Sequence, residues 1–223
     1  MTRNKIFIAI ISLGALIMSA CSTTSGIPDG EQLYTGMKPT EYSDFEDNKH
    51  FRNTKEELDI VLATKPNASL LGSPTVSSPF PFGLWIWNAF NPSNTKLSRW
   101  IVKAFGSKPV LMSYANPALH ESVGEATLAK RGYFHGNISY KLIPQKNPKK
   151  MKMQYFVDMG PLWRYDSIKY VNFPADADSL ISKDSANSVI RNGDPFDLSS
   201  LENERQHLAS LFRNNGYYYY SKE

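Results

Sequence analysis

The side chains that could act as acids, bases or metal ligands are scattered along this chain of 223 residues. Its four histidines are His50, His120, His135 and His207. His120 and His207 fall on expected helices, where a place on the polar face explains them better than a shared metal ion. Glu202 and Glu204 lie near a helix start, where negative charge suits the helix dipole, which explains them better than paired-carboxylate catalysis. With no glycine-rich phosphate loop either, we expect a protein that is not an enzyme and that uses no metal or other cofactor.

Cys21 is the only cysteine, and its position is more informative than its thiol. One cysteine excludes an internal disulfide and a cysteine-based zinc site. Arg3 and Lys5 precede an apolar run at 6–17, and Met18-Ser19-Ala20 follow it. This order predicts a secretory signal peptide at 1–20, because the apolar run is shorter than the roughly 20 residues that span a bilayer.

The segment that ends at Cys21 resembles a bacterial lipobox, in which the cysteine is acylated and becomes the first residue of the mature chain. The resemblance implies that Cys21 carries lipid (palmitate among the acyl groups) and anchors the protein to a membrane. The alternative is an ordinary signal peptide with an incidental cysteine. Residues 21–30 read as a tether that begins with small polar residues and ends in a turn at 27–30.

The overall charge argues against nucleic acid as a partner. The formal net charge is +4, from 25 basic and 21 acidic residues. Arg3 and Lys5 belong to the signal segment, which leaves 23 basic residues against the 21 acidic ones. This balance, without a Lys/Arg stripe interleaved with aromatic residues, is not that of a nucleic-acid-binding surface.

Residues 31–160 have the pattern of one small α+β domain. We expect a short strand at 31–37 and helices at 54–63, 97–105 and 117–131. The last of these helices would turn four side chains inward: Leu119, Val123, Ala126 and Leu128. Alternating apolar residues at 138–142 and 151–157 predict a β-hairpin, whose lysine-bearing turn is better explained as a solvated tip than as a contact with anionic lipid. Gly160-Pro161 marks the end of this domain.

An aromatic segment at 80–90 interrupts that domain and is rich in proline on its amino-terminal side. It holds seven large apolar residues: Phe80, Phe82, Leu84, Trp85, Ile86, Trp87 and Phe90. A membrane-dipping loop and a partner-docking surface are two explanations, because exposed apolar patches usually mark contacts. A buried aromatic plug inside an enlarged domain is the third explanation, and the one that we favour from sequence.

Residues 161–223 predict a second, similar module. A strand is expected at 163–173 and a helix at 178–190. A further helix follows, capped by Asp197 or by Ser199, the latter in a capping box with Glu202. Its apolar face would contain Leu198, Leu201, Leu208, Leu211 and Phe212. Gly216 ends this helix, and residues 217–220 read as a strand.

The end of one helix and the start of the next element occur twice. Lys130-Arg131-Gly132-Tyr133-Phe134 and Asn214-Asn215-Gly216-Tyr217-Tyr218 stand 84 residues apart. Two copies of this pattern imply two copies of one module. The full unit would be β-α-α-β-β, with three strands and two helices on one face; its first copy, 31–160, is enlarged and its second copy, 161–223, lacks the last strand.

These features together resemble the polypeptide-transport-associated (POTRA) repeats of the BamA/TamA outer-membrane assembly family, in the lipid-anchored, TamL-like form of Bacteroidetes-type bacteria. The resemblance covers essentially the whole chain. Besides the lipobox it rests on the stretches IPDGEQLY, KRGYF, FVDMGPLWRYDSIKYV and GDPFDLSSLENERQHLASLFRNNGYYY. Members of the family continue into a C-terminal membrane β-barrel, so we expect this chain to be a fragment or a truncated gene product.

The resemblance implies a function without catalytic residues. POTRA repeats hold unfolded outer-membrane protein clients in the periplasm and pass them to a barrel, and a free sheet edge can bind such clients by β-augmentation. Expected partners are these clients, other envelope assembly subunits and the lipid membrane reached through Cys21. The tether is rich in serine and threonine rather than acidic, which favours the periplasmic side of the outer membrane. The alternative is a free-standing lipid-anchored envelope scaffold without an insertase role.

Overall fold

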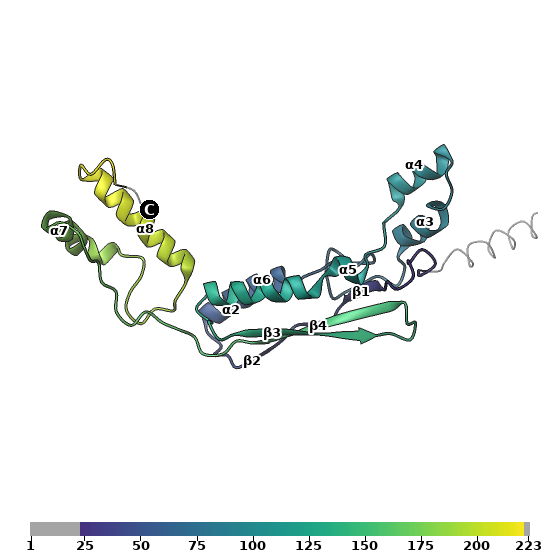
Figure 1. The fold of residues 1–223 in the computed structure, drawn as a ribbon, viewed down its shortest axis with the longest axis horizontal. Coiled ribbons are helices and arrows are strands. Elements are labelled where there is room, and N and C mark those ends of the chain that lie inside the picture. Colours follow the sequence, from purple (N-terminus) through teal and green to yellow (C-terminus); the bar gives the residue numbers. More distant parts are fainter. Residues whose placement is uncertain (1–22, 221–223) are drawn as a thin grey trace, which may run out of the picture. The chain divides into compact units, whose positions relative to one another are not determined.

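The computed structural model describes residues 23–220 and has an α+β fold (Figure 1). Cys21 and the signal segment lie outside the described residues. The chain divides into two compact units, each built from three segments. The first unit comprises Met1–Glu41, Leu62–His120 and Tyr140–Tyr155, and the second comprises Tyr42–Val61, Glu121–Ser139 and Phe156–Glu223.

One four-stranded sheet contains every strand that the structure assigns within 23–220. Its strands are β1 (Leu33–Met37), β2 (Glu41–Ser43), β3 (Asn137–Pro144) and β4 (Lys150–Asp158). β4 is central: β1 and β2 pair with it, and β3 pairs with it as well. β1 runs parallel to β4, whereas β3 and β4 follow each other in a hairpin, as Figure 1 shows. The expected short first strand and the expected hairpin are thus confirmed.

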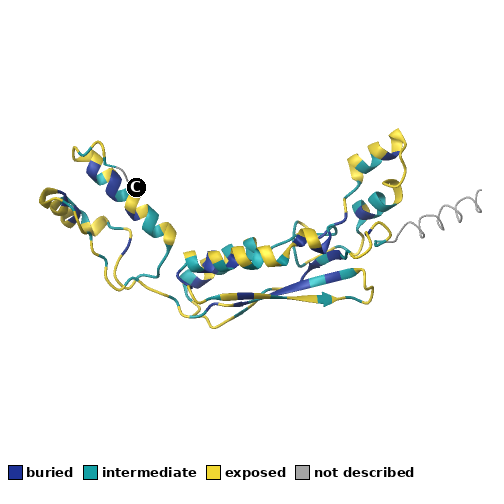
Figure 2. Ribbon diagram, viewed as in Figure 1, coloured by how far each residue is buried: buried dark blue, intermediate teal, exposed yellow. Residues whose placement is uncertain are grey.

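The core of the first unit forms on β4. Met151, Met153 and Tyr155 are buried at alternate positions, because successive side chains of a strand point to opposite faces. Tyr34 of β1 is also buried and donates its hydroxyl hydrogen to the carbonyl of Thr64 at 2.8 Å. Burial raises the pKa of the Tyr34 hydroxyl. Figure 2 shows this concentration of buried residues on β4.

Helix α2 (Lys49–Val61) belongs to the second unit and begins five residues before the expected helix at 54–63. The reason is a cap that the sequence analysis missed: the Asn48 side chain accepts a hydrogen bond from the Phe51 N–H at 2.8 Å. Thr54, expected near the start, instead lies inside the helix and is buried, with its hydroxyl bonded to the His50 carbonyl.

Helix α6 (Pro117–Lys130) is present as expected, but its buried face is not the expected one. Leu119 and Val123 are 55% and 45% exposed, and Leu128 alone of the four predicted residues is buried. The buried stripe consists of Gly124, Thr127 and Leu128. Two of these buried residues are a glycine and a threonine, which a search for apolar residues at helical spacing does not identify as facing inward.

Three helices of the first unit lie between Leu62 and His120. They are α3 (Phe82–Phe90), α4 (Lys96–Phe105) and the short α5 (Met112–Ala115). α4 matches the expected helix at 97–105 and is capped by Thr95, whose side chain accepts from the Ser98 N–H. α3 was not expected, and no helix within 23–220 is both long and apolar enough to cross a membrane.

Residues 161–220 hold two helices, α7 (Ala175–Asp184) and α8 (Leu198–Asn214), with a short 3₁₀ turn at Ser185–Asn187 between them. Their buried core is Ala177, Ile181, Leu208 and Phe212. Asp197 caps α8 by accepting from the N–H groups of Ser199 and Ser200. Helix α7, at Ala175–Asp184, takes the place of the helix expected at 178–190; it is shorter and begins earlier.

The two strands expected in this part of the chain are not there. Residues 163–173 form only an isolated bridge, between Arg164 and Pro195, and residues 217–220 form a turn. The second module, expected with two strands and without its last one, thus appears within 161–220 as helices and connecting segments. Its aromatic residues do not extend a sheet but pack on the helices: Phe173, Tyr217 and Tyr220 all contact Phe212.

The 84-residue repeat nevertheless has a local structural counterpart. Gly132 after α6 and Gly216 after α8 adopt positive φ angles, 86° and 96°. The backbone N–H of the tyrosine after each glycine donates to the carbonyl five residues earlier: Tyr133 to Leu128 and Tyr217 to Phe212. In both copies another turn follows, closed by Gly136 N–H to Tyr133 and Tyr220 N–H to Tyr217. In the first copy β3 begins only after this second turn, so the tyrosines of neither copy start a strand as expected.

Candidate functional site

The histidines are occupied in local contacts and do not gather into a site. Within 23–220 no group of three histidine, cysteine or acidic residues could hold a metal ion. His50 bonds the Arg131 carbonyl at 2.7 Å, and His120 lies 3.3 Å from the Thr64 hydroxyl. His135 packs against the Trp163 ring, and His207 pairs with Asp184.

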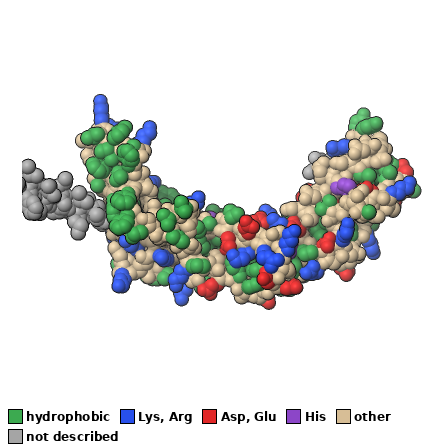
Figure 3. All heavy atoms as spheres, turned by 180° about the vertical axis from the view of Figure 1, so that it is seen from behind, with side chains coloured by type: hydrophobic (Ala, Val, Ile, Leu, Met, Phe, Trp, Pro, Cys, Tyr) green, Lys and Arg blue, Asp and Glu red, His purple; other side chains and the backbone are tan. Residues whose placement is uncertain are grey.

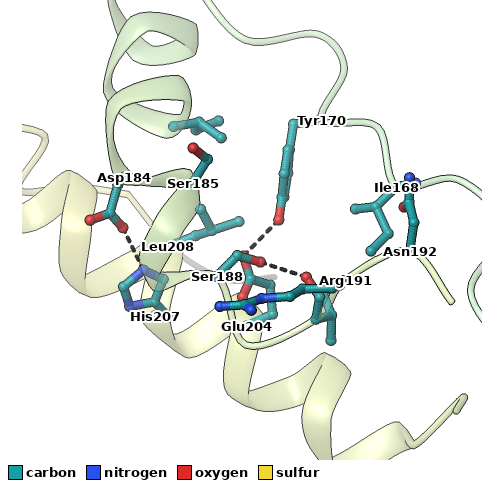
Figure 4. A pocket seen from close by; sticks show the side chains of 12 residues that line it. Ile168, Tyr170, Asp184, Ser185, Ser188, Arg191, Asn192, Glu204, His207 and Leu208 are labelled. Carbon is teal, nitrogen blue, oxygen red and sulfur yellow. Dashed lines mark hydrogen bonds and ion pairs between the residues drawn. The ribbon is translucent and has the colours of Figure 1, made fainter. Parts of the chain in front are cut away.

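A cavity of about 350 Å³ lies between α7, α8 and the loop that joins them (Figure 4). Its buried charge is Glu204, which is 2% exposed. One Glu204 oxygen accepts from the Tyr170 hydroxyl and the other from the Val189 N–H, both at 2.6 Å. Burial and the bond to Glu204 raise the pKa of Tyr170. Since both oxygens have partners, Glu204 serves to join α8 to the loops around it.

The Asp184–His207 pair at the rim of this cavity resembles two members of a catalytic triad, but a third member is missing from the described residues. His207 Nε2 lies 2.5 Å from the Asp184 carboxylate. Hydrogen bonds from Asn187 and His207 lower the pKa of Asp184. The nearby Ser188 hydroxyl donates to the Ile190 carbonyl instead, at 2.8 Å. This arrangement fixes the end of α7 on α8.

Arg131 pairs with two carboxylates of the second unit. It lies 2.7 Å from Glu57 of α2 and 2.5 Å from Asp197 at the start of α8. Burial lowers the pKa of Arg131, but its hydrogen bonds to Glu57 and Asp197 outweigh that effect, so that its pKa is raised. Two backbone hydrogen bonds lie beside it. The Trp163 backbone N–H donates to the Gly132 carbonyl, and the Phe196 backbone N–H donates to the Trp163 carbonyl, both at 2.9 Å.

A different kind of candidate site is the backbone along one edge of the sheet. In the first unit, the outer side of β1 is covered by segments of its own unit. Tyr34 N–H donates to the Val110 carbonyl and Met112 N–H to the Gln32 carbonyl, both at 2.8 Å, and Met37 N–H donates to the Pro74 carbonyl at 3.0 Å. These bonds leave no room for a further strand at β1.

The opposite edge, formed by β3, is open. Residues 140–144 of β3 belong to the first unit, and among the residues described no backbone group bonds them from the side away from β4. Tyr140 packs its ring on Tyr155 of β4, whereas Lys141 and Leu142 are exposed. Earlier in the strand, in the second unit, the Ile138 N–H donates to Glu125 of α6 at 3.3 Å.

An open strand edge is a chemical site in its own right. Its unpaired N–H and C=O groups are a template for another extended chain. Such a chain would gain backbone hydrogen bonds at β3, and its side chains would fall alternately on the two faces. The sequence predicts the hairpin but not which of its strands lies at the edge, because that depends on β1 and β2, which are distant in the chain and pair with β4 rather than with β3.

The predicted lipidation residue, Cys21, lies outside the described residues, and the tether that follows it is described from Thr23. No protein-family model matches this chain, and a search of curated proteins found no match either.

Proposed function

We propose that this chain is the periplasmic, lipid-anchored region of an outer-membrane protein assembly or translocation factor, and that it binds unfolded client polypeptides by strand addition to β3. The observation that carries the proposal is the asymmetry of the sheet in the first unit. β1 is covered by backbone bonds from residues near Val110 and Pro74, whereas residues 140–144 of β3 present their outer side to solvent.

The size of this edge suits transient binding. At about 3.4 Å per residue, residues 140–144 span roughly 17 Å. An extended client segment could form a few backbone hydrogen bonds there, each contributing about 0.5–1.5 kcal/mol net. Binding of this strength is weak and depends little on client sequence. Both properties fit a protein that accepts many clients and passes them to a membrane barrel.

Further support comes from the combination of sheet, helices and repeat. The resemblance to POTRA repeats implies a sheet that accepts clients at its edge, next to a lipid anchor at Cys21. The α+β fold, the hairpin of β3 and β4, and the repeated turn at Gly132 and Gly216 are compatible with repeats of this kind. The second repeat remains a proposal, as does the location of the chain on the periplasmic side of the outer membrane.

A second candidate function is a free-standing lipid-anchored scaffold for envelope complexes, without client insertion. The observation that favours it is Lys141, which is exposed in the middle of the open edge. Natural sheets use edge lysines and prolines to prevent pairing with other strands, and Pro144 ends this one. Under this alternative the edge would be protected rather than used.

Photo-crosslinking from the edge separates the two functions. A photoreactive residue at Leu142 of β3, which is 38% exposed, is compared with one at Tyr114 of α5, which is 66% exposed and lies on a helix. Each protein is mixed with a chemically denatured outer-membrane barrel protein diluted from urea. Adducts that form at position 142 and not at 114 support client binding at β3. Absence of adducts at 142, or equal yields at both positions, would refute it and leave the scaffold.

A further inference from the structure

Helices α3 and α4, with the two residues before α3, form an exposed apolar hairpin (residues 80–105, here the α3–α4 hairpin). The favoured expectation of a buried aromatic plug is wrong, because only Leu84 of the segment 80–90 is buried. Leu97 and Trp100 of α4 are 66% and 60% exposed. The exposed large apolar residues of the hairpin are Phe80, Phe82, Phe90, Leu97, Trp100 and Phe105.

The hairpin is a built structure rather than a loose loop. Helices α3 and α4 pack against each other, and the Ser107 N–H donates to the Gly83 carbonyl at 2.8 Å. A Cβ atom at Gly83 would approach the Ser107 Cβ to 2.8 Å, so the two ends of the hairpin meet where a side chain would not fit. Ser98 is buried and donates to the Ser93 carbonyl at 2.7 Å, which fixes the start of α4. The apolar side chains are therefore held outward by a folded element.

The charges around the hairpin have one sign. No aspartate or glutamate occurs between Asp59 and Glu121. The same stretch contains five basic residues: Lys65, Lys96, Arg99, Lys103 and Lys108. Lys96, Arg99 and Lys103 are exposed on α4, beside the apolar residues. Figure 3 shows hydrophobic side chains gathered over this part of the molecule, with lysine and arginine side chains next to them.

The tether that follows Cys21 is attached to the base of this hairpin. Ile27 is buried in a cluster with Leu33, Leu84 and Leu111. Thr23 and Trp85 line the same cavity of about 290 Å³. Thr23 is two residues from Cys21, and two residues span at most about 7 Å. An acyl group on Cys21 would therefore enter a bilayer close to the start of the hairpin.

We propose that the α3–α4 hairpin is a second membrane contact, which inserts its aromatic and leucine side chains into the interface of an anionic phospholipid bilayer. Tryptophan and other aromatic residues favour this interface, and amphipathic helices bind it through an apolar face flanked by lysine and arginine. Helices of 9 and 10 residues are too short to span a bilayer and lie at its surface instead. The uniform positive charge and the adjacent tether favour anionic lipid over a second copy of the chain or another protein.

Such a contact would orient the protein as well as anchor it. One lipid anchor through a flexible tether leaves the chain free to rotate, and stable membrane attachment commonly combines two signals. With the hairpin bound, the first unit would be held against the membrane surface. This inference goes beyond client binding and is tested without any client.

The test uses the mature chain from residue 21, with Cys21→Ser so that no acyl group is present. This protein keeps every residue that the structure describes, since these begin at Thr23. Binding to phosphatidylcholine vesicles with and without phosphatidylglycerol is measured by flotation. We expect binding that is stronger with phosphatidylglycerol. Leu97→Ser/Trp100→Ser should weaken it by roughly tenfold for each side chain removed from the interface.

Two matched controls keep the test specific. Val171→Ser/Val189→Ser removes two apolar side chains exposed elsewhere and should leave vesicle binding unchanged. Arg99→Gln/Lys103→Gln should reduce the preference for phosphatidylglycerol by roughly fivefold per charge, whereas Lys146→Gln/Lys149→Gln at the β-hairpin turn should not. Circular dichroism checks that each variant is folded.

Three outcomes would overturn the proposal. The wild-type sequence could fail to bind either vesicle. The variants at 97 and 100 could bind as strongly as the wild type, or the lysines of the β-hairpin turn could account for the lipid preference. Light scattering measures whether the protein is a dimer in solution. If Leu97→Ser/Trp100→Ser abolishes a dimer and leaves vesicle binding unchanged, this apolar face is an interface between copies of the chain and the proposal is wrong.

Discussion

Arg131 Nη1 lies 2.5 Å from Oδ2 of Asp197, so a residue just after α6 holds the capping residue of α8. The same guanidinium also binds Glu57 of α2. The side chains of Arg131 and Asp197 are largely shielded from solvent, which strengthens their attraction. One side chain, just after α6, thereby links α2 to the start of α8.

Removing this link should destabilise the protein measurably. Arg131→Gln loses both ion pairs, and we expect the free energy of unfolding to fall by about 1–3 kcal/mol, the range for hydrogen bonds to charged groups. Urea denaturation measures this change. Asp197→Asn is the matched variant, because asparagine still caps a helix and only the charge is lost. The double variant Arg131→Gln/Asp197→Asn measures the coupling between the two side chains. If its loss of unfolding free energy equalled the sum of the two single losses, the two side chains would not interact and the predicted link would be wrong.

The same pair predicts a pH dependence. Burial raises the pKa of Asp197, but the hydrogen bond from Arg131 and those from Ser199 and Ser200 outweigh it and lower its pKa. A carboxyl group whose pKa is lower in the folded state stabilises the fold above its unfolded pKa of about 4 and loses that contribution as pH falls further. Asp197→Asn should therefore flatten the acid side of a plot of unfolding free energy against pH. A variant with the same acid slope as the wild type would contradict the assignment.

The two glycines of the repeated turn should differ in their tolerance of alanine. Both have positive φ, which costs a residue with a Cβ about 1 kcal/mol. At Gly216 nothing lies within 4 Å of the added Cβ, whereas at Gly132 it would come within 2.7 Å of the Phe196 carbonyl oxygen. Gly216→Ala should cost about 1 kcal/mol and Gly132→Ala roughly 2–3 kcal/mol, because the second adds a backbone clash. Thermal or urea unfolding ranks the two, and equal losses would contradict the close approach of Phe196 to Gly132.

Glu204 offers a test of the buried polar contact. Glu204→Gln keeps the shape of the side chain but turns one oxygen into an N–H₂ group, which would face either the Tyr170 hydroxyl or the Val189 N–H. Leaving a buried donor unpaired should cost about 1–3 kcal/mol. Glu202→Gln is the control: its half-exposed ion pair with Arg205 contributes little, so the substitution should change the unfolding free energy by less than about 0.5 kcal/mol. Similar effects of both substitutions would show that Glu204 does not hold the loops.

Local signals predicted much of this fold from sequence. Alternating apolar residues predicted β3 and β4, helical spacing predicted α4, and a glycine after each helix predicted the ends of α6 and α8. These features depend on contacts within a few residues, which sequence patterns report directly.

Features set by distant contacts were predicted less well. The tyrosines after Gly132 and Gly216 have high β propensity, but in both copies they close a turn that is fixed by the preceding helix. The aromatic residues at 80–90 were expected to be buried, but Phe80, Phe82 and Phe90 are exposed on a helical hairpin whose fold the sequence pattern did not predict. For the candidate site, the sequence located the strand but not its free edge, since β3 lies at the edge only because the distant strands β1 and β2 pair with β4.

The most direct test of client binding at β3 is amide hydrogen exchange, measured on residues 21–223 with and without an unfolded barrel-protein segment in excess. Strand addition predicts slower exchange at alternate N–H groups within 140–144, where the outward groups gain partners. Exchange in β1, whose outer side is already covered at Tyr34 and Met37, should not change. Unchanged exchange within 140–144 under saturating client, or protection confined to the helices, would contradict the account.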